Sequence, residues 1–340
     1  MIKDWFRPLI EIPEFGFDFE KARKPRTIDD HLIDFANKKV LKKWGDSFCF
    51  IDFNLIEPEK RMSNGDHPIP FIFDELRKLG CQAIPVTGLQ RDEAHQNEIQ
   101  KVIAQDNSGA CFRITLEQAA ISELKSKVDS LLSMLKIKPD NCDFILDLVS
   151  PNFDPLEGFA KVIRNIVSKL PHLNIWRTFT VLGTSFPETM ADIRMGGEII
   201  PRYEWELYKM LVNDFRKADL RLPAFGDYAI SHPKVLELDI RLVKPTATIR
   251  YTIDDCWYIV KGKNVRDHKF NQYRGLSKQI LDSGYFSSAT FSWGDKYIQE
   301  CASGKGKTGN LTTWRQVGTN HHIVKVTQDI ANFYASSNSL

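Results

Sequence analysis

Eight short apolar runs recur along this chain, and stretches with helical periodicity separate most of them. The runs span residues 7–13, 47–54, 82–88, 110–115, 143–149, 178–185, 221–228 and 247–254, and most end in charged or polar residues. Strand-like runs that alternate with helical stretches indicate β-α units and a parallel sheet. The pattern predicts an α/β fold, a (β/α)8 TIM-like barrel, which gathers its chemistry at the C-terminal ends of the strands.

The length of 340 residues suits one barrel, which needs about 250 residues, with additional segments attached. We expect residues 1–262 to supply the barrel strands and helices. Residues 263–340 are then the closing helix and a C-terminal helical extension of the same domain. A turn at Asp254-Asp255 is expected to connect the eighth run to a further strand, CWYIVKG.

The composition is that of an ordinary globular protein, with 42% hydrophobic and 26% charged residues. No apolar run approaches the roughly 18 residues of a membrane span. The N-terminal segment lacks the apolar core of a secretory signal, so we expect a cytoplasmic protein with no membrane partner. The six cysteines are spread singly, which argues against a disulfide framework or a zinc knuckle.

Charge is distributed unevenly, although the formal net charge is only +2. Residues 261–325 contain eleven Lys or Arg and four Asp or Glu, which gives this stretch a local net charge of +7. Basic patches attract nucleic acid or phosphate. Nucleic acid binding through residues 261–325 and an ordinary solvated surface are therefore both open interpretations.

The strand ends carry a mixed set of charged side chains. Alternate residues of a barrel strand point inward, and Glu11 and Asp147 each stand two positions after an apolar strand residue. The full set of candidates is Glu11, Asp52, Arg113, Asp147, Asp227, Arg250 and Tyr251. Carboxylates beside arginines can bind a metal or a phosphate, or perform acid–base catalysis. The alternative is a buried salt-bridge network, since a buried charge must be paired.

Three other motifs give weaker signals. Asp227 and His232 lie in one turn, but no G-x-S-x-G motif supplies a nucleophile. The loop SGKGKTGN is not a Walker A motif, because the required first glycine position holds Cys301. The adjacent His321 and His322 point in different directions on a helix, so they are not a chelating pair, and we predict no metal site.

Five segments, taken in order, resemble the "beta protein" family named from a large tailed phage. They are RPLIEIP, ILDL, FGDYAISHP, ATIRYTIDDCWYIVKG and TTWRQVGTNHH, and the resemblance covers nearly the whole chain. It implies a phage-related or mobile-element context rather than a reaction. It also directs attention to Arg250, Tyr251, Trp257 and the turn at residues 226–228. Lys261 stands where the resemblance leads us to expect Arg, and Lys lacks the planar fork that binds phosphate bidentately.

Three functions remain open, and the sequence identifies no cofactor. In the first, an antiphage or phage-related barrel binds a small anionic or phosphorylated ligand, such as a nucleotide, at its mouth. Catalytic or orienting carboxylates are then Glu11, Asp147 and Asp227, and the ligand-binding residues are Asp52, Arg113, Arg250, Tyr251, Trp257 and Lys261. The second is a non-catalytic interaction module that contacts a protein partner or nucleic acid in a phage-defence assembly. The third, a metal-dependent phosphodiesterase, ranks last because H-x-H and H-E-x-x-H motifs are missing.

Overall fold

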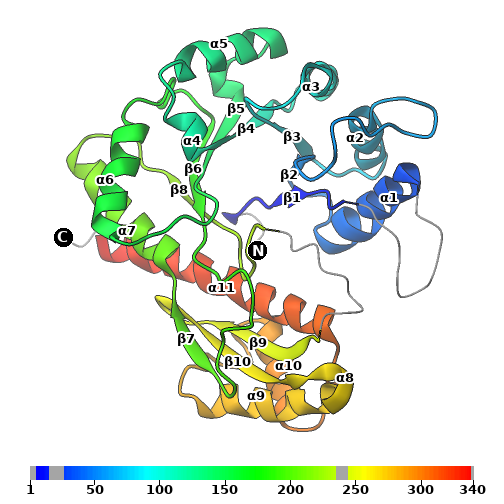
Figure 1. Cartoon of the computed structure of the whole chain (residues 1–340), viewed down its shortest axis with the longest axis vertical. Coiled ribbons are helices and arrows are strands. Elements are labelled where there is room, and N and C mark those ends of the chain that lie inside the picture. The colour runs from blue at the N-terminus through cyan, green and yellow to red at the C-terminus, as the bar shows by residue number, and fades with distance from the viewer. Residues whose placement is uncertain (1–4, 15–26, 235–243, 338–340) are drawn as a thin grey trace.

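A curled sheet of seven parallel strands forms the main body of the computed structural model, which describes residues 5–14, 27–234 and 244–337 (Figure 1). The strand order is β1-β2-β3-β4-β5-β6-β8, so consecutive strands are neighbours. Their bounds are β1 Leu9–Glu11, β2 Cys49–Asp52, β3 Ala83–Thr87, β4 Ala110–Thr115, β5 Cys142–Asp147, β6 Thr178–Gly183 and β8 Ala224–Asp227. Seven of the eight predicted runs are thereby confirmed as strands of one parallel sheet.

Helices cover the outer face of this sheet (Figure 1). They are α1 Ile28–Asp34, which continues as the π-helix η2 Phe35–Leu41, then α2 Pro68–Lys78, α3 Glu93–Asp106, α4 Leu116–Ala119, α5 Leu124–Leu135, α6 Leu156–Val167 and α7 Tyr203–Lys217, with the 3-10 turn η3 Pro139–Asn141 before β5. Several begin with a side-chain cap; Asp92, for example, accepts the backbone N–H of His95 at 2.9 Å. The largest apolar core lies between these helices and the sheet and includes Phe112, Phe144 and Trp176.

The eighth run belongs to a different sheet, so the predicted closed barrel of eight strands is not found. Residues 247–254 fall in β9 (Thr246–Thr252), which pairs antiparallel with β10 (Cys256–Asn264). A short turn at Asp254-Asp255 joins the two strands, and such a turn permits only a hairpin, whereas parallel neighbours need a long crossover. Residues 235–243, which precede this strand, lie outside the described residues.

A third strand, β7 (Glu198–Pro201), completes this small antiparallel sheet in the order β7-β10-β9. Residues 183–202 contain two prolines and the pair Gly196-Gly197, a composition typical of a loop rather than a strand. One face of the sheet packs on α8 (Val265–His268), the turn η4 (Phe270–Gln272), α9 (Tyr273–Asp282) and α10 (Trp293–Ala302). The other face presents Trp257 and Ile259 to Phe186 and Ile230, which follow β6 and β8.

The long C-terminal helix α11 (Leu311–Ser337) passes between the two sheets (Figure 1). Its N-terminal part packs in the core of the small sheet, where Trp314 stacks on Tyr273 at 4.4 Å. Its C-terminal part contributes Phe333 and Tyr334 to a cluster with α7 and β8. The helix therefore covers the β8 end of the parallel sheet. None of the helices in the described ranges is long and apolar enough to cross a membrane.

Candidate functional site

Charged side chains lie above an apolar layer inside the curled sheet, near the C-terminal ends of its strands. The apolar layer includes Leu9, Phe50, Cys111 and Ile145. Two residues further along the same four strands stand Glu11, Asp52, Arg113 and Asp147, and each of the three carboxylates contacts Arg113. Side chains alternate between the two faces of a strand, so each apolar residue and the charged residue after it share the inner face.

Arg113 is the centre of this group, which we call the Arg113 cluster: Glu11, Asp52, Arg113, Asp147 and Tyr228. Its Nη1 donates to Glu11 at 2.6 Å and to Asp52 at 2.9 Å, and its Nε donates to Asp147 at 2.8 Å. Its Nη2 donates to the Tyr228 hydroxyl at 2.9 Å. Burial by itself lowers the pKa of Arg113, but Asp147, Tyr228 and the other carboxylates raise that pKa above its ordinary value. All three guanidinium nitrogens are therefore committed to protein oxygens.

The Arg113 cluster also connects the two ends of the parallel sheet. Glu11 ends β1, the first strand, and Tyr228 follows β8, the last, yet both bond to Arg113 in the middle. The Tyr228 hydroxyl donates in turn to Asp147 at 2.7 Å. Burial, followed by the charge of Asp147, raises the pKa of Tyr228, so the phenol keeps its proton. The salt-bridge interpretation thus accounts for part of this arrangement, because the network holds the curled sheet together.

The backbone is strained immediately after two of the strands that carry the cluster. Val149 and Ala229 adopt left-handed conformations, with φ of 60° and 54°. This conformation costs a non-glycine residue on the order of 1–3 kcal/mol and concentrates at functional sites. The side chain at each strand end stabilises the turn: Asp147 accepts the N–H of Val149 at 2.8 Å, and Asp227 accepts that of Ala229 at 2.9 Å.

Arg91 extends the cluster and is not among the site residues predicted from the sequence. Its Nη2 donates to Asp52 at 2.7 Å, so Asp52 bridges Arg91 and Arg113. The position of Arg91 just after β3 was a usable signal, since residues that follow barrel strands line the C-terminal face. His95, one turn into α3, is buried with its Nε2 lacking a partner among the described residues. Burial and the charge of Arg91 lower the pKa of His95 to about 4, so this imidazole is neutral.

Two predicted site residues point away from the cluster. Asp227 precedes the inward-facing Tyr228 and therefore faces the other side, where it accepts a hydrogen bond from His322 Nε2 at 2.8 Å. Arg250 lies in β9, and its Nη1 donates to the Ile230 carbonyl at 2.6 Å. Burial, then the charge of Arg315, lowers the pKa of Arg250 to about 10.

Three more predicted ligand-binding residues lie in the small sheet. The Tyr251 hydroxyl donates to Asp295 at 2.7 Å, and the buried Trp257 packs on Phe186 with ring centroids 5.0 Å apart. Lys261 Nζ donates to three backbone carbonyls, at 2.6 to 2.9 Å. The structure therefore brings together four predicted residues and places Asp227, Arg250, Tyr251, Trp257 and Lys261 elsewhere. The expectation of one shared opening fails because residues 247–254 belong to the small sheet and because Asp227 faces the other side of β8.

The structure also separates the two adjacent histidines, as the helical spacing predicted. His321 Nδ1 lies 2.8 Å from Asp295 in α10, which packs on the small sheet, whereas His322 bonds to Asp227 of the parallel sheet. In the part of the chain that the structure describes, no group of three or more His, Cys, Asp or Glu side chains is placed to hold a metal ion.

The free energy of unfolding is expected to depend on pH through Glu204, near the start of α7. Its Oε2 accepts the N–H and hydroxyl of Ser185, while Oε1 lies 3.7 Å from Arg202 Nε without a hydrogen-bond partner among the described residues. Burial raises the pKa of Glu204 from 4.5 to about 7. The folded chain therefore holds a proton that the unfolded chain releases, and this stabilisation is full below pH 4.5 and is lost as the pH rises to about 7.

We expect Glu204→Gln to remove this dependence. Relative to the variant, the free energy of unfolding of the wild type should fall by about 3 kcal/mol between pH 4.5 and 7.5. Urea unfolding at a series of pH values measures the difference. Parallel pH curves for the two proteins would contradict the assignment of this titration to Glu204.

Comparison with known proteins gives one match over nearly the whole chain. The family model described as "Beta protein" matches residues 1–328. No curated protein is significantly similar to the chain. Among solved structures, a trimodular GH5_4 subfamily endoglucanase aligns at 8% identity and a TM-score of 0.31, covering 67% of this chain and 56% of that one. The chain thus spans just over half of that enzyme's length, and so low a TM-score gives no basis for transferring its fold or activity.

Proposed function

The chain belongs to the Beta protein family, and on that premise we propose that it binds a small polar ligand at the C-terminal end of the curled parallel sheet. The observation that carries the proposal is the position of Glu11 in the Arg113 cluster. Its side chain is 23% exposed, while those of Asp52 and Asp147 are almost fully buried. Ligands of barrels and of open α/β sheets bind at this end of the strands.

The charges favour a ligand that donates hydrogen bonds. Three carboxylates face two guanidinium groups, so the Arg113 cluster together with Arg91 is net negative. Arg113 Nη1 engages Oε1 of Glu11, and Oε2 has no partner among the described residues. A hydroxyl or an amine can donate to this oxygen. We infer that Glu11 orients the ligand, while Asp52 and Asp147 hold Arg113 in place beneath it.

A phosphorylated ligand at the same place is the second candidate. The three cations expected to hold it, Arg113, Arg250 and Lys261, all donate to protein oxygens. A phosphate beside Glu11 would therefore meet a partly exposed carboxylate, while Arg91, a cation with uncommitted donors, lines a separate groove. In either case, we place the binding activity in the phage-related setting that the family resemblance implies.

A thermal-shift screen tests the proposal and separates the two candidates. The compounds are sugars and polyols, amines, amino acids, nucleotides and other phosphate esters. A ligand that binds only the folded chain raises the melting temperature by mass action. We expect the strongest stabilisation from a compound with hydroxyl or amino donors and no phosphate. Stabilisation by phosphate esters alone that changes in Glu11→Gln would favour the second candidate, and no stabilisation by any class would contradict ligand binding.

A further inference from the structure

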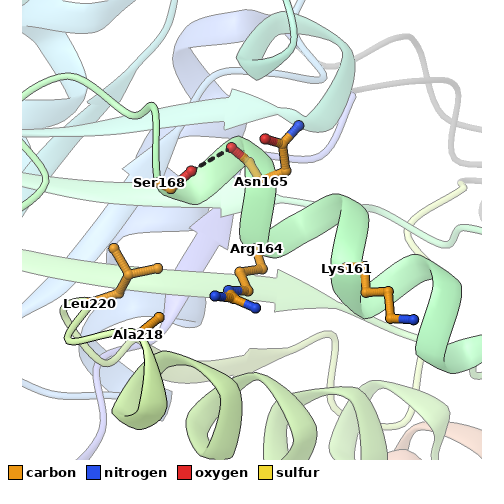
Figure 2. A pocket seen from close by; sticks show the side chains of 6 residues that line it. All are labelled: Lys161, Arg164, Asn165, Ser168, Ala218 and Leu220. Atoms are coloured by element: carbon orange, nitrogen blue, oxygen red, sulfur yellow. Dashed lines mark hydrogen bonds between the residues drawn. The ribbon is translucent and has the colours of Figure 1, made fainter.

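A groove between α3 and α5 opens beside Arg91, outside the Arg113 cluster. It has a volume of about 600 Å³, within the range of small-molecule sites. A smaller pocket of about 400 Å³ lies between α6 and α7 and is lined by Lys161, Arg164 and Leu220 (Figure 2). The lining of that pocket includes no member of the Arg113 cluster, whereas Arg91 lines the α3–α5 groove and bonds to Asp52.

The α3–α5 groove holds cations that still have donors to offer. Arg91 is 18% exposed and commits only Nη2, to Asp52, among the described residues. Lys127 is exposed on α5, and its ammonium forms no hydrogen bond in the described part of the chain, although its charge acts on Glu123 one turn earlier. Glu93 is the only acidic residue in the lining, and Asp52, which pairs with Arg91, is buried outside it, so the lining itself offers two cationic side chains and one carboxylate. Arg113 and Lys261, by contrast, are fully engaged.

The remaining walls combine hydroxyl groups with apolar side chains. Ser126 and Ser130 supply hydroxyls from α5, and Ser126 already donates to the Glu123 carbonyl, so its oxygen is left as an acceptor. Leu131 and Met134 form an apolar wall one and two turns further along the helix. A lining that combines cationic, hydroxyl and apolar groups suits a compact amphiphilic anion.

We propose that the α3–α5 groove binds a small phosphate monoester with an apolar substituent. The phosphate pairs with Arg91 and Lys127, because charge-assisted hydrogen bonds to phosphate are the strongest such contacts available here. The substituent lies against Leu131 and Met134. This site is separate from the ligand proposed at Glu11, although Asp52 links Arg91 to Arg113.

Titration with phenyl phosphate tests the inference, with inorganic phosphate and phenol as the two halves of the probe. Calorimetry in phosphate-free buffer of low ionic strength keeps screening of the charges small. We expect phenyl phosphate to bind more tightly than either half. Lys127→Gln should weaken its binding by about tenfold, the effect of one lost charge-assisted hydrogen bond. Lys125→Gln is the matched control, because Lys125 lies on the same helix, pairs with Asp129 and does not line the groove.

Two results would overturn the inference: no saturable binding of phenyl phosphate, or an equal loss in both lysine variants. The outcome is independent of the ligand proposed at Glu11, since Lys127 contacts no member of the Arg113 cluster. If phenyl phosphate does not bind in the groove, ligand stabilisation that depends on Glu11 is unaffected. If no ligand binds at Glu11, phenyl phosphate binding that depends on Lys127 is still expected.

Discussion

Replacing Arg113 with methionine is expected to lower the free energy of unfolding by about 3–5 kcal/mol. The variant leaves Asp52 and Asp147 buried without the guanidinium that all three cluster carboxylates share. It also removes the connection between β1 and β8 through Glu11 and Tyr228. Removing one partner of a buried ionic network is costly, because the desolvated charges that remain lose their compensation.

Urea unfolding at pH 7 measures this loss, and Arg113→Lys provides the graded comparison. Lysine keeps the charge but lacks the planar fork that reaches several oxygens at once. The free energy of unfolding of Arg113→Lys should therefore lie between those of the wild type and Arg113→Met. An Arg113→Met protein as stable as the wild type would show that the cluster does not hold the curled sheet together.

The second large loss of stability is expected on substitution of Asp295 in α10, one of the helices that pack on the small sheet. Asp295 is fully buried and accepts hydrogen bonds from Tyr251 at 2.7 Å and Ser292 at 2.5 Å. His321 Nδ1 lies 2.8 Å from the same carboxyl group, and Nε2 of that ring lies 2.7 Å from the Thr252 carbonyl. A carbonyl oxygen only accepts, so Nε2 carries a hydrogen.

Asp295→Ala should therefore lower the free energy of unfolding by about 3–5 kcal/mol, because it leaves the buried donors of Tyr251, Ser292 and His321 unpaired. A double-mutant cycle with His321→Ala isolates the interaction of the pair. We expect a coupling of at least about 1 kcal/mol between the two sites. A loss below about 1 kcal/mol for Asp295→Ala, or additive effects in the cycle, would contradict a role for this network in stability.

The local pattern of the sequence was enough to predict the parallel strands and which side chains of β1 and β5 face the inside of the curled sheet. Alternation along each strand placed Glu11 two positions after Leu9 and Asp147 two positions after Ile145, and both contact Arg113 inside the curled sheet. These predictions succeed because side-chain direction in a strand depends only on the parity of the position. Consecutive parallel strands also tend to be neighbours, so the order of the sheet followed from the order of the chain.

The predictions fail where the local sequence pattern does not determine which strands pair, or which side chains of a strand face inward. Residues 247–254 do form a strand, but a turn of two residues gives it an antiparallel partner in another sheet. At the end of β8, a shift of one position reverses which side chain faces inward, and the inner residue is Tyr228 rather than Asp227. Arg91 was missed because it lies in a loop, where no periodicity indicates the direction of a side chain.

The measurement that most directly tests the central claim is a calorimetric titration of the best stabilising ligand into wild type, Glu11→Gln and Glu59→Gln. Glu59 is an exposed carboxylate in the loop after β2 and serves as the control, since it does not belong to the Arg113 cluster. We predict that Glu11→Gln raises the Kd by at least about tenfold, while Glu59→Gln leaves it unchanged. A Kd that is the same in all three proteins would show that the ligand does not bind at Glu11, and that the Arg113 cluster only stabilises the fold.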